Sequence, residues 1–189
     1  MQTLNRMRIA ILLFSLLSCG VASAAAQTVI LVRHAEKAQV PGNDPPLSEV
    51  GTARAQALQA ALQHANVQHV IVTSRRRTTL TAAAVIAAQH LLPVVIPYGD
   101  GDSAQVAAVA AAVRRIPAGD AVLVVGHSNT VPPIIAALGG PRMPDLCDAS
   151  YSTIFVLELG SSPMRLVRAH YGAPDPPGAD SCTTEMETH

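Results

Sequence analysis

Three short apolar runs that each end in basic or imidazole side chains constrain this chain more than any other feature. In chain order, these runs and the motifs that follow them are Thr28–Val32 with Arg33-His34, His69–Thr73 with Ser74-Arg75-Arg76-Arg77, and Ala121–Val125 with Gly126-His127. Continuous apolar runs of this length are typical of strands buried on both faces of a parallel sheet. Since ligands bind at the carboxyl ends of such strands, we expect the three motifs to meet in one crevice.

Segments with helical periodicity alternate with the apolar runs. The segment after Ser48, which can cap it, repeats small and apolar residues at Ala57/Leu58, Ala61/Leu62 and Ala65, and Thr78–His90 directs Leu80, Ala83/Ala84, Ala87 and Leu91 inward. Next we expect a short strand in Leu92–Pro97 and a helix that is capped by Ser103 and ends near Arg115. After them we expect a helix with Pro132 and Pro133 in its first turn, and a hairpin of Thr153–Leu159 and Met164–His170. This alternation predicts a three-layer α/β/α sandwich with a mostly parallel central sheet.

Composition narrows the function. The formal net charge is zero and the basic residues are dispersed apart from Arg75–Arg77, so the chain lacks the basic face of a nucleic-acid-binding protein. The histidines at positions 64, 69, 90 and 170 belong to no motif and lack metal-ligand spacing, so we expect them at the surface or in packing.

Residues 1–24 have the pattern of an export signal. Arg6 and Arg8 precede the apolar stretch Ile9–Leu17, and Ala22-Ser23-Ala24 forms a small-residue cleavage site. This pattern predicts a periplasmic or secreted protein. The alternative is a lipoprotein signal in which Cys19 is lipidated and tethers the protein to a membrane.

The mature chain divides into an expected domain over residues 27–171 and a Pro/Gly-rich tail over residues 172–189. An oxidising exported compartment permits a disulfide between Cys147 and Cys182, although two unrelated thiols are the alternative. Such a bridge would hold the tail, which has little else to fix it.

The side chains expected in the crevice suit a dianionic phosphoryl group. Arginine binds phosphate oxygens through a planar fork of donors, and a neutral imidazole can attack phosphorus. Phosphoryl transfer depends chiefly on positioning and on cations near the transferred group.

The motifs also resemble those of a known family. Leu31–Lys37 resembles the Arg-His-Gly-Glu signature of the histidine phosphatase superfamily, which includes the phosphoglycerate mutases. Ser74–Ala82 resembles the segment carrying the second phosphate-binding arginine, and Gly126–Thr130 resembles the segment carrying the second histidine. The resemblance covers roughly residues 28 to 159 and implies a phosphoglycerate mutase-like fold.

The resemblance implies that His34 is the nucleophile and forms a transient phosphohistidine. Arg33, Arg77 and His127 would then surround the phosphoryl oxygens. The start of the helix at Arg77 would add backbone N–H groups, and Ser128 and Asn129 would either donate further hydrogen bonds or cap a helix. Arg75 or Arg76 could replace Arg77 in this role.

The general acid is less defined. One branch of the family has Asp directly after the second histidine, where this chain has Ser128. Other members use an acidic residue between the second arginine and the second histidine, and Asp100 and Asp102 lie in that region, where Asp100 has the alternative role of shaping a turn. Glu36 is a candidate equal to Asp102 because it belongs to the first motif and is near His34 in sequence, and its alternative role is to orient Arg33 or Lys37.

Together these features predict an exported phosphomonoesterase that uses neither a metal nor an organic cofactor. Its expected substrate is a small phosphorylated molecule or an exposed phosphate on an envelope component. The alternatives are a non-catalytic phosphate-binding module and a phosphatase of lipopolysaccharide core sugars. The oligomeric state cannot be inferred from the sequence.

Overall fold

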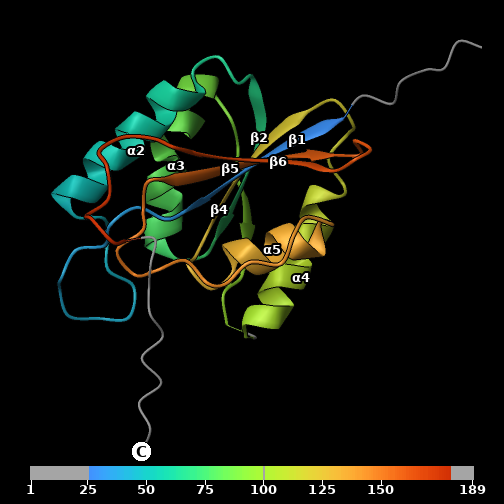
Figure 1. The fold of residues 1–189 in the computed structure, drawn as a ribbon. Helices are drawn as coiled ribbons and strands as arrows, with labels where there is room; N and C mark the ends of the chain where they lie inside the picture. The colour runs from blue at the N-terminus through green and yellow to red at the C-terminus, as the bar shows by residue number, and fades with distance from the viewer. Residues whose placement is uncertain (1–25, 100, 180–189) are drawn as a thin grey trace, which may run out of the picture.

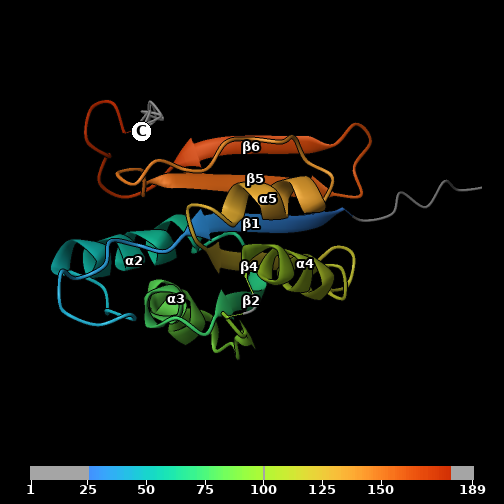
Figure 2. The ribbon, with the colours of Figure 1, turned by 90° about the horizontal axis from the view of Figure 1, so that it is seen from below.

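A six-stranded sheet forms the centre of residues 26–99 and 101–179, the part of the chain that this computed structural model describes. The strands are β1 Gln27–Arg33, β2 Val67–Thr73, β3 Val94–Ile96, β4 Ala121–Gly126, β5 Thr153–Leu159 and β6 Arg165–His170. They lie in the order β3-β2-β4-β1-β5-β6, which can be followed from β2 to β6 in Figure 2. Strands β1 to β4 run parallel to one another, whereas β5 is antiparallel to both of its neighbours, β1 and β6, so the prediction of a mostly parallel sheet with a closing hairpin is confirmed.

Four helices in the same described residues cover the two faces of the sheet: α2 Glu49–Leu62, α3 Arg76–Gln89, α4 Asp102–Val113 and α5 Val131–Ala137. Helices α2 and α3 lie on one face, and α4 and α5 lie on the other (Figure 1). Each face has its own apolar cluster, one including Leu58 of α2 and Val85 of α3, the other including Val109 of α4 and Ile134 of α5. The three-layer α/β/α prediction is confirmed.

Helix starts follow local chemistry. The Ser48 hydroxyl accepts the backbone N–H of Gly51 at 3.0 Å and caps α2, as predicted. Helix α5 carries prolines in its first turn, where their missing N–H groups cost nothing, and this prediction is also confirmed. The predicted cap of α4 is wrong, because that helix begins at Asp102 and its N-cap is Gly101 rather than Ser103.

The predicted buried face of α3 is also wrong. Leu80 is 38% exposed, and the buried residues of this helix are instead Thr78, Thr81, Ala82 and Val85. The threonine hydroxyls find acceptors inside the protein, since Thr78 Oγ1 donates to the backbone oxygen of Thr73 at 3.0 Å. The buried face of this helix therefore includes polar residues, and a prediction from apolar residues alone places the buried face on the wrong side. Helix α2 differs in the same way, because it buries Arg54 and exposes Ala61.

Strand register brings two of the motifs together. Arg33 is paired with Gly126 in the parallel ladder between β1 and β4, and the backbone N–H of His34 donates to the Gly126 oxygen at 2.9 Å. His34 and His127 therefore leave the sheet side by side. Thr73, the last residue of β2, lies at the same carboxyl edge of the sheet.

The chain after β6 turns back over α2 (Figure 1). There Arg54 Nη1 donates to the backbone oxygen of Ala173 at 3.0 Å, which fixes the beginning of the predicted tail. The expected export signal, Cys19 and Cys182 lie outside the described residues, so the leader and the Cys147–Cys182 bridge stay predictions. Among the residues that are described, we find no helix with the length and apolar character needed to span a membrane.

Candidate active site

His34 lies directly after β1 and is only 5% exposed. Its Nδ1 is 2.8 Å from the backbone oxygen of Ala35. Because a carbonyl can only accept, Nδ1 carries the hydrogen and the Nε2 lone pair of the neutral ring is left free. The pKa of His34 is lowered to about 3, mainly by burial and also by the nearby His127, Arg77 and Arg33, while the hydrogen bond to Ala35 acts in the opposite direction. The imidazole is therefore neutral and nucleophilic at neutral pH.

His127 faces His34, with 5.3 Å between the ring centroids. Arg77 Nη2 donates to its Nδ1 at 3.3 Å, so Nε2 carries the hydrogen and donates to Thr73 Oγ1 at 3.1 Å. Burial, together with nearby arginines of which Arg77 has the largest effect, lowers the pKa of His127 to about 3. Thr73 and Arg77 thus set the tautomer of this second neutral ring.

Arg33 is held by the segment 147–151. Its Nη1 donates to the backbone oxygens of Cys147 at 2.8 Å, Asp148 at 3.0 Å and Ser150 at 3.1 Å. The guanidinium carbon lies 4.0 Å from the centroid of the Tyr151 ring. The buried Nε has no acceptor among the described residues. The guanidinium is therefore held through both terminal nitrogens, while its Nε–H is left without an acceptor in the described part of the protein.

Arg77 lies in the first turn of α3, beside His127. Its buried Nε also lacks an acceptor within the part of the chain that is described. The same holds for the Nε of Arg75, but of these three arginines only Arg33 and Arg77 line the same cleft as the two neutral imidazoles, where their positive charge suits a phosphoryl group. The rival arginines are placed differently, since Arg75 lies 4.6 Å over the Tyr98 ring and Arg76 is exposed.

The backbone N–H groups at the start of α3 were predicted to help bind the phosphoryl group, and this prediction is wrong for the first of them. The backbone N–H of Arg76 donates to both carboxylate oxygens of Asp44, at 3.0 and 3.1 Å. The Asp44 carboxylate also lies 3.9 Å from Arg77 Nη1. A carboxylate of the protein itself therefore occupies this end of the helix.

These groups line a cleft of about 440 Å³ at the carboxyl edge of the sheet. Arg33, His34, Arg77 and His127 all contribute to its wall. Ser128 and Asn129 line the cleft as well, so every predicted phosphate-binding residue reaches it. One wall comes from the loop between β1 and α2, including Lys37 and Asn43.

Neither predicted acid lines this cleft. Both carboxylate oxygens of Glu36 accept from Arg54 Nε, at 2.9 and 3.0 Å, so Glu36 does not pair with Arg33 and does not line the cleft with His34. Asp102 lies at the edge, where its Oδ2 accepts from Asn129 Nδ2 at 2.7 Å. Asp148, which the sequence did not single out, does line the cleft. Asp100 lies outside the described residues.

Comparisons with known proteins agree with this geometry. Residues 29–98 match the family model of the histidine phosphatase superfamily (branch 1). The SixA proteins of Agrobacterium tumefaciens and Nakamurella multipartitia, which carry the name phosphohistidine phosphatase, have similar structures. They are 24% and 26% identical to this chain, with TM-scores of 0.56 and 0.54. The matches cover 78% and 80% of this chain, and 98% and 99% of those chains. None of the curated proteins compared with the sequence matches it.

Residues 29–98 therefore resemble the histidine phosphatase superfamily, as the sequence motifs predicted. A third similar structure is the protein histidine phosphatase SixA in complex with tungstate, with 19% identity and a TM-score of 0.56 over 76% of this chain and 95% of that one. At this identity the likeness shows the fold alone.

Several residues of this site were not predicted from the sequence. Thr73, Tyr98 and Tyr151 contact the arginines and histidines, and Tyr98 meets His127 with 4.8 Å between ring centroids. Thr73 could have been found, because it is the last residue of a strand that precedes a motif. Tyr151 could not, because only the fold places it beside Arg33.

Proposed function

We propose that this histidine phosphatase hydrolyses phosphate monoesters through a phosphohistidine on His34. The observation that carries the proposal is the free Nε2 lone pair of a buried neutral imidazole, set beside His127 in a cleft that Arg33 and Arg77 also line. A neutral imidazole is the form of histidine that attacks phosphorus.

The proposed reaction has two displacements. In the first, the Nε2 lone pair of His34 forms a bond to phosphorus while the ester P–O bond breaks, and the leaving oxygen takes up a proton. In the second, water attacks phosphorus and gives a proton back to the carboxylate that acted as the acid, while the P–N bond breaks, which releases inorganic phosphate and restores the neutral ring. Arg33 and Arg77 stabilise the charge that spreads over the equatorial oxygens in both steps.

We propose Asp102 as the proton donor to the leaving oxygen. It is joined to the cleft through Asn129, whereas the Glu36 carboxylate is bound to Arg54. Asp148 is the competing carboxyl because it lines the cleft beside Arg33. The two carboxyls differ in the effect that their removal should have on substrates with poor leaving groups.

The substrate we propose is a small phosphorylated molecule or an exposed phosphate on an envelope component. The cleft volume and the cationic wall support a compact anionic group. Because the SixA neighbours are named phosphohistidine phosphatases, phosphohistidine peptides should be screened as substrates together with phosphosugars and small metabolites.

We further propose that residues 1–24 direct export to the periplasm or the medium. The support is the sequence pattern alone. Mass spectrometry of the protein recovered from cell fractions tests this: a mature chain beginning after Ala24 or Ala26 supports export. A lipid-modified chain beginning at Cys19 would show tethering instead, and an intact leader in the cytoplasm would contradict both.

The decisive experiment for activity combines turnover with trapping of the intermediate. The purified protein should hydrolyse p-nitrophenyl phosphate, and acid-free mass spectrometry after rapid mixing should locate the phosphoryl group on His34. His34→Ala should abolish both signals, whereas His64→Ala, at an exposed histidine, should keep them. Phosphate binding without turnover would instead support the non-catalytic module, and turnover by His34→Ala would remove His34 as the nucleophile.

A further inference from the structure

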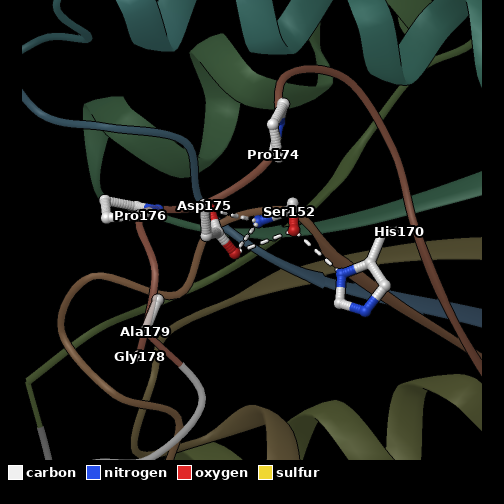
Figure 3. A pocket seen from close by; sticks show the side chains of 7 residues that line it. All are labelled: Ser152, His170, Pro174, Asp175, Pro176, Gly178 and Ala179. Carbon is white, nitrogen blue, oxygen red and sulfur yellow. Dashed lines mark hydrogen bonds between the residues drawn. The ribbon is translucent and has the colours of Figure 1, made fainter.

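Asp175, in the segment after β6, accepts an unusually complete set of hydrogen bonds. Its Oδ1 accepts the backbone N–H groups of Tyr151 and Ser152, each at 3.0 Å. Its Oδ2 accepts the same Ser152 N–H at 2.9 Å and the Ser152 hydroxyl at 2.8 Å. Figure 3 shows the Asp175 side chain directed at Ser152. The carboxylate thus fixes the backbone at the start of β5 to the C-terminal segment.

This backbone is continuous with the segment that holds Arg33. Ser150 and Tyr151 directly precede Ser152, and Arg33 Nη1 donates to the Ser150 oxygen at 3.1 Å. The Tyr151 ring lies 4.0 Å from the Arg33 guanidinium carbon, and its hydroxyl accepts from Nη2 at 3.3 Å. Asp175 therefore holds, from behind, the residues that orient Arg33.

A buried arginine joins Asp175 to the other side of the site. Arg54 is 4% exposed, and its Nη2 lies 3.6 Å from Asp175 Oδ1 and 2.7 Å from Glu36 Oε1. Glu36 is two residues after His34. The Glu36–Arg54–Asp175 chain of contacts therefore supports the segment with the nucleophile and the segment that holds Arg33 at once.

Asp175 is ionised in this setting. Burial alone would raise its pKa, but the hydrogen bonds from Ser152 and Tyr151, together with Arg54, hold the pKa below its ordinary value. A carboxylate that accepts several N–H groups is a stronger anchor than a neutral amide, because charge-assisted hydrogen bonds are the stronger kind.

The cluster of Ser152, His170 and Asp175 is not a second hydrolytic centre. Ser152 donates its only hydroxyl hydrogen to Asp175, so His170, 2.9 Å away, must donate from Nδ1 to the serine oxygen. A serine nucleophile needs the opposite arrangement, with histidine accepting its proton. Ser152 is moreover only 2% exposed. The cluster is structural and belongs to the anchor.

We propose that Asp175 is a positioning residue that holds Arg33 in the orientation that binds the phosphoryl group. This proposal rests on the proposed function of Arg33 in the same cleft. Asp175 acts through the backbone of residues 150–152 and touches no reacting atom. Replacing Asp175 should therefore weaken phosphate binding by no more than the contribution that Arg33 makes to that binding.

A double-mutant cycle tests this coupling with inorganic phosphate as the ligand, measured by calorimetry, which requires no turnover. Asp175→Asn removes the charge and one acceptor oxygen, and should raise the Kd of phosphate about tenfold, within the range seen for residues that orient ligand-binding groups. In an Arg33→Ala background the same substitution should change the Kd less than twofold. An equal effect in both backgrounds, or no effect in either, would overturn the proposal.

Asp120→Asn is the matched control. Asp120 accepts from His69 at 2.9 Å and from Gln68 at 3.2 Å, and it directly precedes β4, at the end of the sheet opposite to the cleft. Its substitution should leave the Kd unchanged. If circular dichroism shows that Asp175→Asn is unfolded, Asp175→Glu, which keeps the charge and lengthens the side chain, is placed in the same cycle with the same criterion. Failure of the cycle leaves the turnover test of His34 unaffected, so the two proposals fail separately.

Discussion

The carboxylate of Asp44 binds the first backbone N–H of α3, that of Arg76, through both oxygens at 3.0 and 3.1 Å. The contact ties the tip of the loop between β1 and α2 to the helix, while the backbone bond from Ala38 to Pro46 closes its base at 2.9 Å. Several residues of this loop form a wall of the cleft. The same carboxylate lies 3.9 Å from Arg77, where it opposes the binding of an anion.

Asp44→Asn should therefore strengthen phosphate binding. The amide keeps one acceptor for the Arg76 N–H but removes a negative charge beside Arg77. We expect the inhibition constant of inorganic phosphate to fall about threefold at low salt, in keeping with the modest size of partly exposed ion pairs, and the effect to shrink as salt is added. Asp145→Asn, at an exposed carboxylate, provides the control. A higher inhibition constant for Asp44→Asn would show that the loop anchor outweighs the charge.

Acid should destabilise this protein through its buried histidines. The pKa of His34 is about 3 in the folded state against an ordinary 6.5, so between these values the unfolded chain binds a proton that the folded chain does not. The free energy of unfolding therefore falls as the pH drops below about 6.5, by up to about 1.4 kcal/mol per pH unit for each such group. His34→Gln should show a shallower fall than the natural protein in urea unfolding at pH 7, 6 and 5. Parallel curves would show that His34 is not buried in its neutral form.

Thr73→Val should impair catalysis by freeing His127. The substitution keeps the shape of the side chain but removes the oxygen that accepts from His127 Nε2. We expect kcat/KM to fall about tenfold, as for other residues that orient a functional histidine, and the free energy of unfolding to fall by about 1–3 kcal/mol because a buried donor loses its acceptor. Nitrogen chemical shifts of His127 would report the loss of the fixed tautomer. Thr79→Val, at an exposed position of α3, should change neither quantity.

Leaving groups distinguish the candidate acids. An alkyl phosphate needs a proton on its leaving oxygen, whereas p-nitrophenol leaves readily without one. Because Glu36 is bound to Arg54, Glu36→Gln should lower the free energy of unfolding by about 2 kcal/mol and leave the ratio of alkyl to aryl turnover unchanged. Asp102→Asn should lower that ratio by about a hundredfold. If Asp148→Asn lowers it instead, the acid is Asp148.

The sequence predicted the parts of the site that depend on local pattern. Arg33, His34, Arg77 and His127 each follow a buried strand or open a helix, and parallel register alone brings such positions to one edge. What it missed depends on contacts between distant segments. Asp44 reaches α3 across 32 residues, and Asp175 reaches Ser152 from a segment expected to be a loosely held tail. Glu36 was predicted to lie in the cleft because it is near His34 in sequence. Its carboxylate instead binds Arg54, a buried residue of α2, and only the fold shows this contact.

The path of the chain after β6 has a practical consequence. A shortened protein that stops at His170 would still contain the sequence of every strand and helix described above. It would nevertheless lack the acidic group that steadies the loop behind Arg33. Truncations of this protein, and fusions made close to β6, should accordingly be judged by their affinity for phosphate and not by their secondary structure.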